Sequence, residues 1–224
     1  MVGRQARAEA TRQSIIDAAV ELFRDVGYTE TDMTDVVQHA GIPGGTCYYY
    51  FPTKSSLAEA IIDLSNVRIA AAIGGLLESD APAMHRLISA TFRFIAATEA
   101  DDTARVGYQL RQNFRAFSRV QSGGPGDTHV LFGSGLKMAI VDGHVRDDIN
   151  VREAARTLVA AVVGSRLLAD TFSDDPFGRL ADAWRIILGS IATESAHGEL
   201  NRLVTTEART RHPGRSATPG ATRR

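Results

Sequence analysis

The fold of this protein is decided by the stretch AGIPGGTCYYYFPTK at residues 40–54. A short apolar segment of helical period precedes it, with Asp32 as a candidate N-cap and Gly41 as the residue that ends the helix. After Pro43, a second segment of about two turns runs to Phe51 and contains no charged side chain. Two short helices joined by a turn with glycine form a helix-turn-helix, although many plain helical hairpins share this pattern.

Outward from this stretch, apolar residues recur at three- and four-residue steps along most of the chain, and no alternating run competes as a strand. The pattern predicts an all-α protein: a first helix at about 9–26, two short helices, a long helix from about 53 to 78, and five or so longer helices. The last of these would run from Phe177 to about Leu203. We expect a head of residues 1–52, a helical body of residues 53–204, and a disordered basic tail of residues 205–224, because the tail lacks an apolar face.

Composition excludes several classes of protein. No apolar stretch approaches the roughly 18 residues that a membrane helix needs, and Glu9, Asp17 and Glu21 stand where a signal peptide would be apolar. A single cysteine, Cys47, excludes an internal disulfide framework and a cysteine-rich zinc site. No Ser/His/Asp set, paired carboxylates or phosphate loop is present, so we expect a cytoplasmic protein that is not an enzyme and holds no metal or cofactor.

Residues 9–62 resemble the DNA-binding domain of the tetracycline-repressor (TetR) family. The matching pieces, which are spaced without gaps, are IIDAAVELF at 15–23, Gly27-Tyr28, Ala40-Gly41-Ile42, Gly45-Thr46, Tyr48-x-Tyr50-Phe51 and Thr53-Lys54. The resemblance implies a homodimeric transcriptional regulator that binds double-stranded DNA at a pseudo-palindromic operator, because one helix-turn-helix reads too few bases alone.

In that family, positions matching Tyr48, Tyr49 and Lys54 hold phosphates, and Tyr50 lies beside them. Family members usually have serine at Pro43 and often lysine at Gly44, so base reading would fall to few side chains here. The candidate DNA-binding residues are Thr34, Gly45, Thr46, Tyr48, Tyr49, Tyr50 and Lys54.

Each of these positions has a structural alternative. We expect Phe51 and Cys47 to be core residues, and Tyr50 to be either a phosphate donor or a packing residue. Arg4, Arg7 and Arg12 precede or open the first helix, either as a solvated arm or as contacts to DNA. Residues 1–60 hold five basic and eight acidic side chains, so DNA binding would depend on a few placed groups and not on a broad basic field.

The same resemblance implies that the body binds an effector and forms the dimer. Candidate interface residues come from the last two expected helices, with an internal core as the alternative: Ala160, Gly164, Leu167, Leu168, Trp184, Ile187, Leu188 and Ile191. Candidate pocket residues mix apolar and amide side chains, again with plain core as the alternative: Phe92, Gln109, Leu110, Asn113, Phe114, Phe117 and Val163.

More loosely, the chain resembles the γ-butyrolactone-receptor branch of the family, which senses diffusible autoregulators. That branch usually has a ligand-stacking tryptophan near the position of Thr128, whereas the only tryptophan here is Trp184. We therefore expect a repressor released by a small, moderately apolar effector, which could be a γ-butyrolactone. The alternative is a regulator or activator without small-molecule input.

Overall fold

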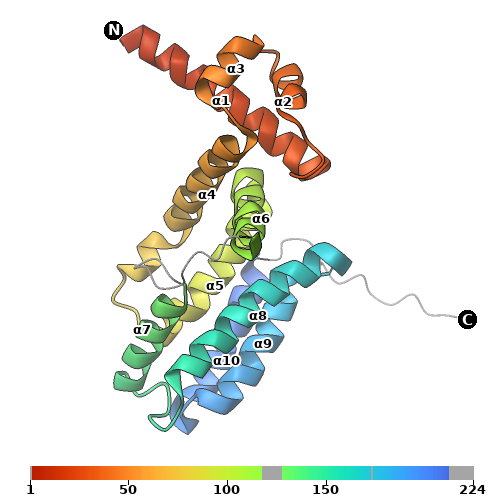
Figure 1. Cartoon of the computed structure of the whole chain (residues 1–224). Coiled ribbons are helices and arrows are strands. Elements are labelled where there is room, and N and C mark those ends of the chain that lie inside the picture. The colour runs from red at the N-terminus through yellow and green to blue at the C-terminus, as the bar shows by residue number, and fades with distance from the viewer. Residues whose placement is uncertain (1, 118–127, 173, 212–224) are drawn as a thin grey trace, which may run out of the picture. The chain divides into compact units, whose positions relative to one another are not determined.

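A computed structural model describes residues 2–117, 128–172 and 174–211 of the chain. In this part of the chain it contains ten α-helices and no strand, which confirms the all-α prediction (Figure 1). The helices are α1 (Val2–Asp25), α2 (Met33–Ala40), α3 (Gly44–Tyr50), α4 (Lys54–Leu77), α5 (Ala83–Ala100), α6 (Asp102–Phe117), α7 (Thr128–Val141), α8 (Val151–Phe172), α9 (Pro176–Ile191) and α10 (Glu194–Arg211).

The first helix and the last two helices have limits that differ from those expected. Helix α1 begins at Val2, so Arg7 lies on a helix and not on a preceding arm. The prediction of a single helix at 177–203 is wrong, because the helix is interrupted between the end of α9 at Ile191 and the start of α10 at Glu194. At the break, the N–H of Thr193 donates to the carbonyl of His144 at 3.0 Å, so these residues bond to the α7–α8 connection and not along a helix.

The start of the expected disordered tail is also helical. Helix α10 continues to Arg211, and it is held by the buried side chains of Leu200 and Val204. The prediction of disorder was therefore wrong for residues 205–211. The rest of the expected tail, residues 212–224, lies outside the described residues.

The described chain divides into two compact units. The first comprises residues 2–72 with residues 97–117, so it joins the three N-terminal helices to most of α4 and to α6. The expected boundary after residue 52 falls inside this unit. Its core is formed by side chains from α1, α2, α3, α4 and α6, among them Ile15, Ile16, Phe23, Val36, Cys47, Phe51, Leu57, Ile61, Val106 and Leu110.

Helices α4 and α6 approach each other closely within the first unit. A Cβ added at Gly107 would overlap the Cβ of Ser65 and lie 2.7 Å from the carbonyl oxygen of Ile61. The buried Ser65 hydroxyl donates to the carbonyl of Ala104 at 2.9 Å. Glycine at 107 therefore lets α6 lie directly against the backbone of α4.

The second unit comprises residues 73–96, 128–172 and 174–211. Helix α9 packs against both α8 and α10, and α8 also packs against α7 (Figure 1). Trp184 lies in the core of this unit, where its indole N–H donates to the hydroxyl of Thr91 at 2.9 Å. The Thr91 hydroxyl donates in turn to the carbonyl of Ile88 at 2.7 Å, so this buried polar pair is satisfied.

None of the described helices combines the length and the apolar character needed to span a bilayer.

The close contact of α4 and α6 makes Gly107 sensitive to substitution. We expect Gly107→Ala to lower the free energy of unfolding by about 1–3 kcal/mol, because the added methyl group overlaps α4. Urea denaturation followed by circular dichroism measures this loss. Gly74→Ala in α4 is the matched control, since a Cβ there meets no atom within 4 Å; equal stability of the two variants would contradict the prediction.

Candidate nucleic-acid interface

Helices α2 and α3 form the helix-turn-helix expected from the sequence. Asp32 is the N-cap of α2, and the Asp35 carboxylate accepts the backbone N–H of Asp32 at 2.7 Å. Helix α2 ends at Gly41, whose φ of 63° is left-handed and whose N–H donates to the carbonyl of Gln38. Glycine adopts this conformation without the strain that a Cβ would cause, so the direction of the turn is encoded locally.

Helix α3 has one buried side and one exposed side. Cys47 and Phe51 point into the core, which confirms the expectation that both are core residues. Burial raises the pKa of the Cys47 thiol, so this cysteine is a small apolar side chain and not a reactive thiolate. On the opposite side, Tyr48 is 45% exposed and Tyr49 is 81% exposed.

Most of the predicted DNA-binding residues lie at or near this exposed side. Thr34 and Gly45 are exposed and Thr46 is half-buried. Gly45 and Tyr49 are four residues apart on the same helix, so they share a face. Tyr50 is partly buried against the core, and its ring meets that of Tyr49 edge to face at 5.4 Å between centroids. This packing can hold Tyr49 in place while leaving its phenol in solvent.

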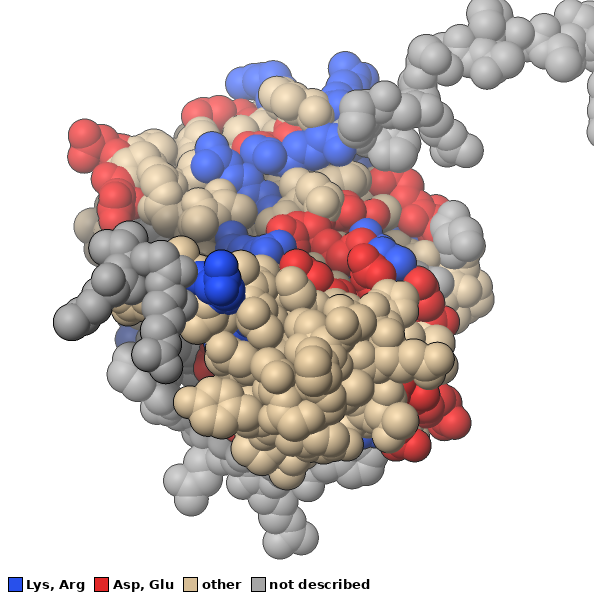
Figure 2. All heavy atoms as spheres, turned by 90° about the horizontal axis from the view of Figure 1, so that it is seen from above, with Lys and Arg blue, Asp and Glu red and all other residues tan. Residues whose placement is uncertain are grey.

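The interface contains few charges. Residues 33–53 include no lysine or arginine. Figure 2, which looks down on the molecule from above, shows a broad area without acidic or basic side chains and a group of acidic side chains along its right-hand edge. The Arg12 guanidinium of α1 lies 5.5 Å from the ring centroid of Phe51, at the end of α3. Arg12 is therefore a basic group that lies beside the end of α3.

Lys54 has contacts that the sequence did not predict. Its ammonium donates to the backbone carbonyls of Tyr28 at 2.9 Å, Thr29 at 3.3 Å and Thr31 at 2.8 Å. It also lies 4.6 Å from the centroid of the Tyr28 ring. The expected phosphate contact of Lys54 would have to compete with these bonds.

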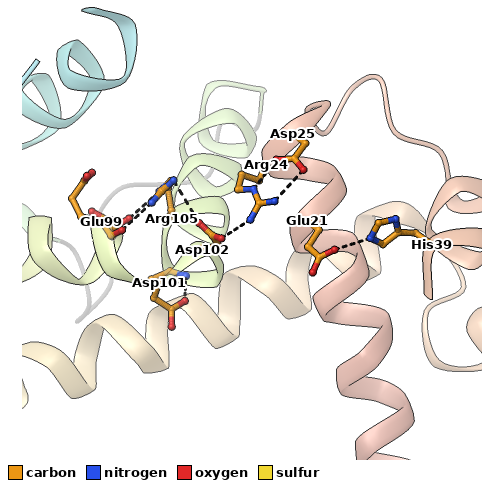
Figure 3. Close-up of polar contacts among 10 residues, drawn as sticks. Glu21, Arg24, Asp25, His39, Glu99, Asp101, Asp102 and Arg105 are labelled. Carbon is orange, nitrogen blue, oxygen red and sulfur yellow. Dashed lines mark hydrogen bonds and ion pairs between the residues drawn. The ribbon is translucent and has the colours of Figure 1, made fainter. Parts of the chain in front are cut away.

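A polar network on the same unit connects α1 with the start of α6 (Figure 3). The Arg24 guanidinium donates to both carboxylate oxygens of Asp25 and, at 2.6 Å, to the carboxylate of Asp102. The hydrogen bond between Arg24 and Asp25 raises the pKa of Arg24 and lowers that of Asp25, so both groups stay charged. Arg105 extends the network through an ion pair with Asp102 at 3.5 Å, and it also donates to the carbonyls of Thr98 and Glu99. No sequence signal indicated this network, because its partners are up to 78 positions apart.

A second polar contact in Figure 3 joins α1 to α2. His39 and Glu21 lie 2.7 Å apart between Nε2 and Oε2, on exposed sides of the two helices. Helix α1 is thus bonded on one side to the helix-turn-helix and on the other to α6.

Comparison with known proteins identifies the family of this helix-turn-helix protein. Residues 15–61 match the model of the tetR family of bacterial regulatory proteins. The chain is 30% identical over 196 residues to the A-factor receptor protein of Streptomyces griseus, a match covering 85% of this chain and 67% of that protein. The chain belongs to the TetR family.

Other TetR-family relatives agree with this assignment. The chain is 37% identical over 62 residues to the regulator AcrR of Shigella flexneri, which covers 28% of this chain and 29% of that protein. A crystal structure of a γ-butyrolactone receptor (ArpA-like protein) has a TM-score of 0.78 at 27% identity, over 91% of this chain and 99% of that chain. CprB from Streptomyces coelicolor, solved in complex with its operator sequence, has a TM-score of 0.75 at 27% identity, over 91% of this chain and 99% of that chain.

Half of the residues predicted for the dimer interface are buried within the single chain. Trp184, Ile187, Leu188 and Ile191 lie inside the core of the second unit, so they are not on the surface of the single chain. The outward side of α9 instead carries Ile186, which is 74% exposed. The apolar stripe of α9 was found correctly, but it faces its own chain.

The α8 half of the predicted interface remains a prediction. Ala160, Leu167 and Leu168 are exposed and Gly164 is partly exposed, so these residues can meet a partner.

The predicted effector pocket also remains a prediction. Phe92 is buried and Val163 half-buried in the second unit, whereas Leu110 is buried and Gln109 exposed in the first. The side chains of Asn113, Phe114 and Phe117 lie outside the described residues. Within the described part, no three His, Cys, Asp or Glu side chains are grouped as metal ligands.

The exposed phenol of Tyr49 gives a direct test of the interface. We expect Tyr49→Phe to weaken binding to operator and to random duplex DNA alike, by roughly 3- to 15-fold, because a phosphate contact carries no sequence information. Fluorescence anisotropy with two labelled duplexes measures both affinities, and Tyr108→Phe, at a buried position of α6, controls for the loss of a phenol elsewhere in the same unit. A loss confined to one base pair of the operator would contradict the assignment to phosphate.

Proposed function

We propose that the protein is a homodimeric repressor that binds a pseudo-palindromic DNA operator and leaves it when a small effector binds. The observation that carries this proposal is the short helix α3, whose buried Cys47 and Phe51 leave Tyr48 and Tyr49 in solvent. The relatedness of nearly the whole chain to the A-factor receptor supports the assignment. Such a protein would act in the cytoplasm, where the DNA is.

Phenol hydroxyls and one guanidinium group would hold the DNA in this proposal. Tyr48 and Tyr49 would donate to phosphate oxygens, with Arg12 at the end of α3 as an added cation. Thr46, Gly45 and Thr34 would face the base edges, where a hydroxyl can pair with several bases and a glycine permits close approach.

The dimer would form through the outward sides of α8 and α9. Leu167 and Leu168 on α8, together with Ile186 on α9, are exposed apolar side chains. Gly164 on α8 and Gly189 on α9 meet no neighbouring atom within 4 Å of an added Cβ, so these helices have room for close approach of a second pair. Two protomers would then place two α3 helices on successive major grooves.

Placing a negatively charged side chain on the proposed dimer surface tests it. We expect Leu167→Glu and Ile186→Glu to convert the dimer to monomers and to abolish operator binding, because an unpaired carboxylate is costly in an apolar interface. Sedimentation velocity measures the association state. Met138→Glu, on an exposed position of α7, is the matched control and should stay dimeric; a dimeric Leu167→Glu variant would locate the interface elsewhere.

The proposed effector is a small, moderately apolar molecule of the γ-butyrolactone type. Two observations support it: the related receptor of Streptomyces griseus is named for A-factor, and a structural relative is named a γ-butyrolactone receptor. An effector changes DNA binding only by its difference in affinity for the two states of the dimer. It would therefore have to bind better to a dimer whose α3 helices do not fit successive grooves.

The second candidate is a regulator without small-molecule input. It is favoured by the lack of a tryptophan near Thr128, where receptors of the γ-butyrolactone branch usually have one. Such a protein would still bind its operator, but a partner protein or its own abundance would set its activity.

Lactone binding separates the two candidates. We expect an alkyl-substituted γ-butyrolactone at a hundredfold excess over its Kd to stabilise the protein by about 2.7 kcal/mol and to release it from operator DNA. Thermal unfolding and the fluorescence of Trp184, the only tryptophan, measure binding. The ring-opened hydroxy acid of the same lactone is the control. If no lactone or metabolite shifts the melting temperature, the second candidate stands.

A further inference from the structure

We propose that α3 recognises thymine bases through their 5-methyl groups, and that such a methyl group packs on the bare backbone at Gly45. This inference rests on the proposed DNA-binding function and deepens it by naming the base that the helix selects. Two features of the molecule carry it: the side chains that α3 lacks, and a glycine that the free protein does not require.

Helix α3 lacks the side chains with which proteins usually identify three of the four bases. Guanine is typically bound by arginine or lysine, adenine by asparagine or glutamine, and cytosine by a carboxylate. The residues of α3, GGTCYYY, include none of these types. Thymine differs, because its methyl group in the major groove is recognised by apolar contact and needs no charged or amide side chain.

Polar side chains of α2 lie on the side of that helix toward α1. Asp35 and Gln38 line an open groove between the end of α1 and α2. The start of α3 instead faces Val37, whose Cγ1 lies 3.9 Å from the position of a Cβ added at Gly44. Bases opposite α3 would therefore meet the side chains and backbone of α3 itself.

Neither the conformation nor the packing of the free protein requires glycine at position 45. The described glycines with positive φ are Gly27, Gly41 and Gly143, so Gly45 has a backbone that any residue can adopt. A Cβ added at Gly45 meets no atom within 4 Å, and the position is exposed. Glycine is also less favourable than alanine inside a helix. Its presence is explained if the missing side chain makes room for a group on the DNA.

The surroundings of Gly45 suit a methyl group. Tyr49, four residues later on the same face of α3, is 81% exposed and offers an aromatic ring. Thr46, which follows Gly45, is half-buried and carries a methyl group of its own. A thymine methyl group could thus touch the Gly45 Cα and these two neighbours, whereas sugars and phosphates at the same place would give no selection of sequence.

Deoxyuridine in place of thymidine tests the methyl contact, because it removes the methyl group and leaves base pairing unchanged. The probe is the best duplex that the wild type selects from a randomised pool, with its thymines replaced one at a time in both half-sites. We expect thymine in each selected half-site, and one replacement that lowers affinity about fourfold per half-site, the factor that burial of one methyl group contributes. Replacements at the other thymines are the controls.

Gly45→Ala tests the position, because it adds a methyl group to the protein where the base would place one. We expect it to bind the thymine duplex roughly fivefold or more weakly than the wild type does, and the deoxyuridine duplex about equally well. A double-mutant cycle measures this recovery. Gly74→Ala in α4, where an added Cβ also meets no atom within 4 Å, is the matched control and should bind both duplexes like the wild type. Neither variant should melt below the wild type, because alanine favours a helix.

Two results would overturn the proposal: selected half-sites in which no thymine can be replaced by deoxyuridine with loss of affinity, and an equal loss for Gly45→Ala on both duplexes. If Gly45→Ala does not fold, the deoxyuridine scan of the wild type still decides whether methyl groups are recognised. A wild type that selects no duplex would refute the proposed function itself. A selected duplex without any dependence on methyl groups would refute this inference alone.

Discussion

The inward packing of Cys47 and Phe51 is the constraint on which the DNA-reading surface depends. Helix α3 has seven residues and begins with two glycines, each of which costs about 1 kcal/mol of helix propensity, so it would not form alone. Burial of the Phe51 side chain contributes about 1.5–3 kcal/mol and fixes which side of the helix faces inward. The exposure of Tyr48 and Tyr49 is the consequence of that orientation of the helix.

The unit that presents α3 is larger than a three-helix head. Gly107 brings α6 against α4, and Arg24 bonds α1 to Asp102 at the start of α6. Exposed ion pairs of this kind contribute little free energy, so packing does most to hold α6. Helices α4 and α5 each have residues in both compact units. Chain continuity is thus a path by which a change in the helical body would reach α3.

An interface with so few cations has consequences for how the proposed repressor would bind DNA. Phenols donate hydrogen bonds to phosphate without releasing counterions as a cation does, so affinity would depend less on salt than for a basic domain. Correct orientation of α3 would matter more for such an interface than total charge. Binding would then respond to small rotations of the helices, which is a property that an effector-controlled repressor needs.

The sequence by itself determined the features that depend on near neighbours: the helical periods, the Asp32 cap, the left-handed Gly41, and the inward sides of Cys47 and Phe51. The tertiary structure alone decided which partner covers each apolar stripe. Periodicity found the stripe of Trp184, Ile187 and Leu188, but it could not show that the same chain covers it. In the same way, the resemblance located Lys54 without showing that three carbonyls from a turn more than twenty residues earlier take its protons. Contacts between distant segments leave no periodic trace, because only the folded chain brings those segments together.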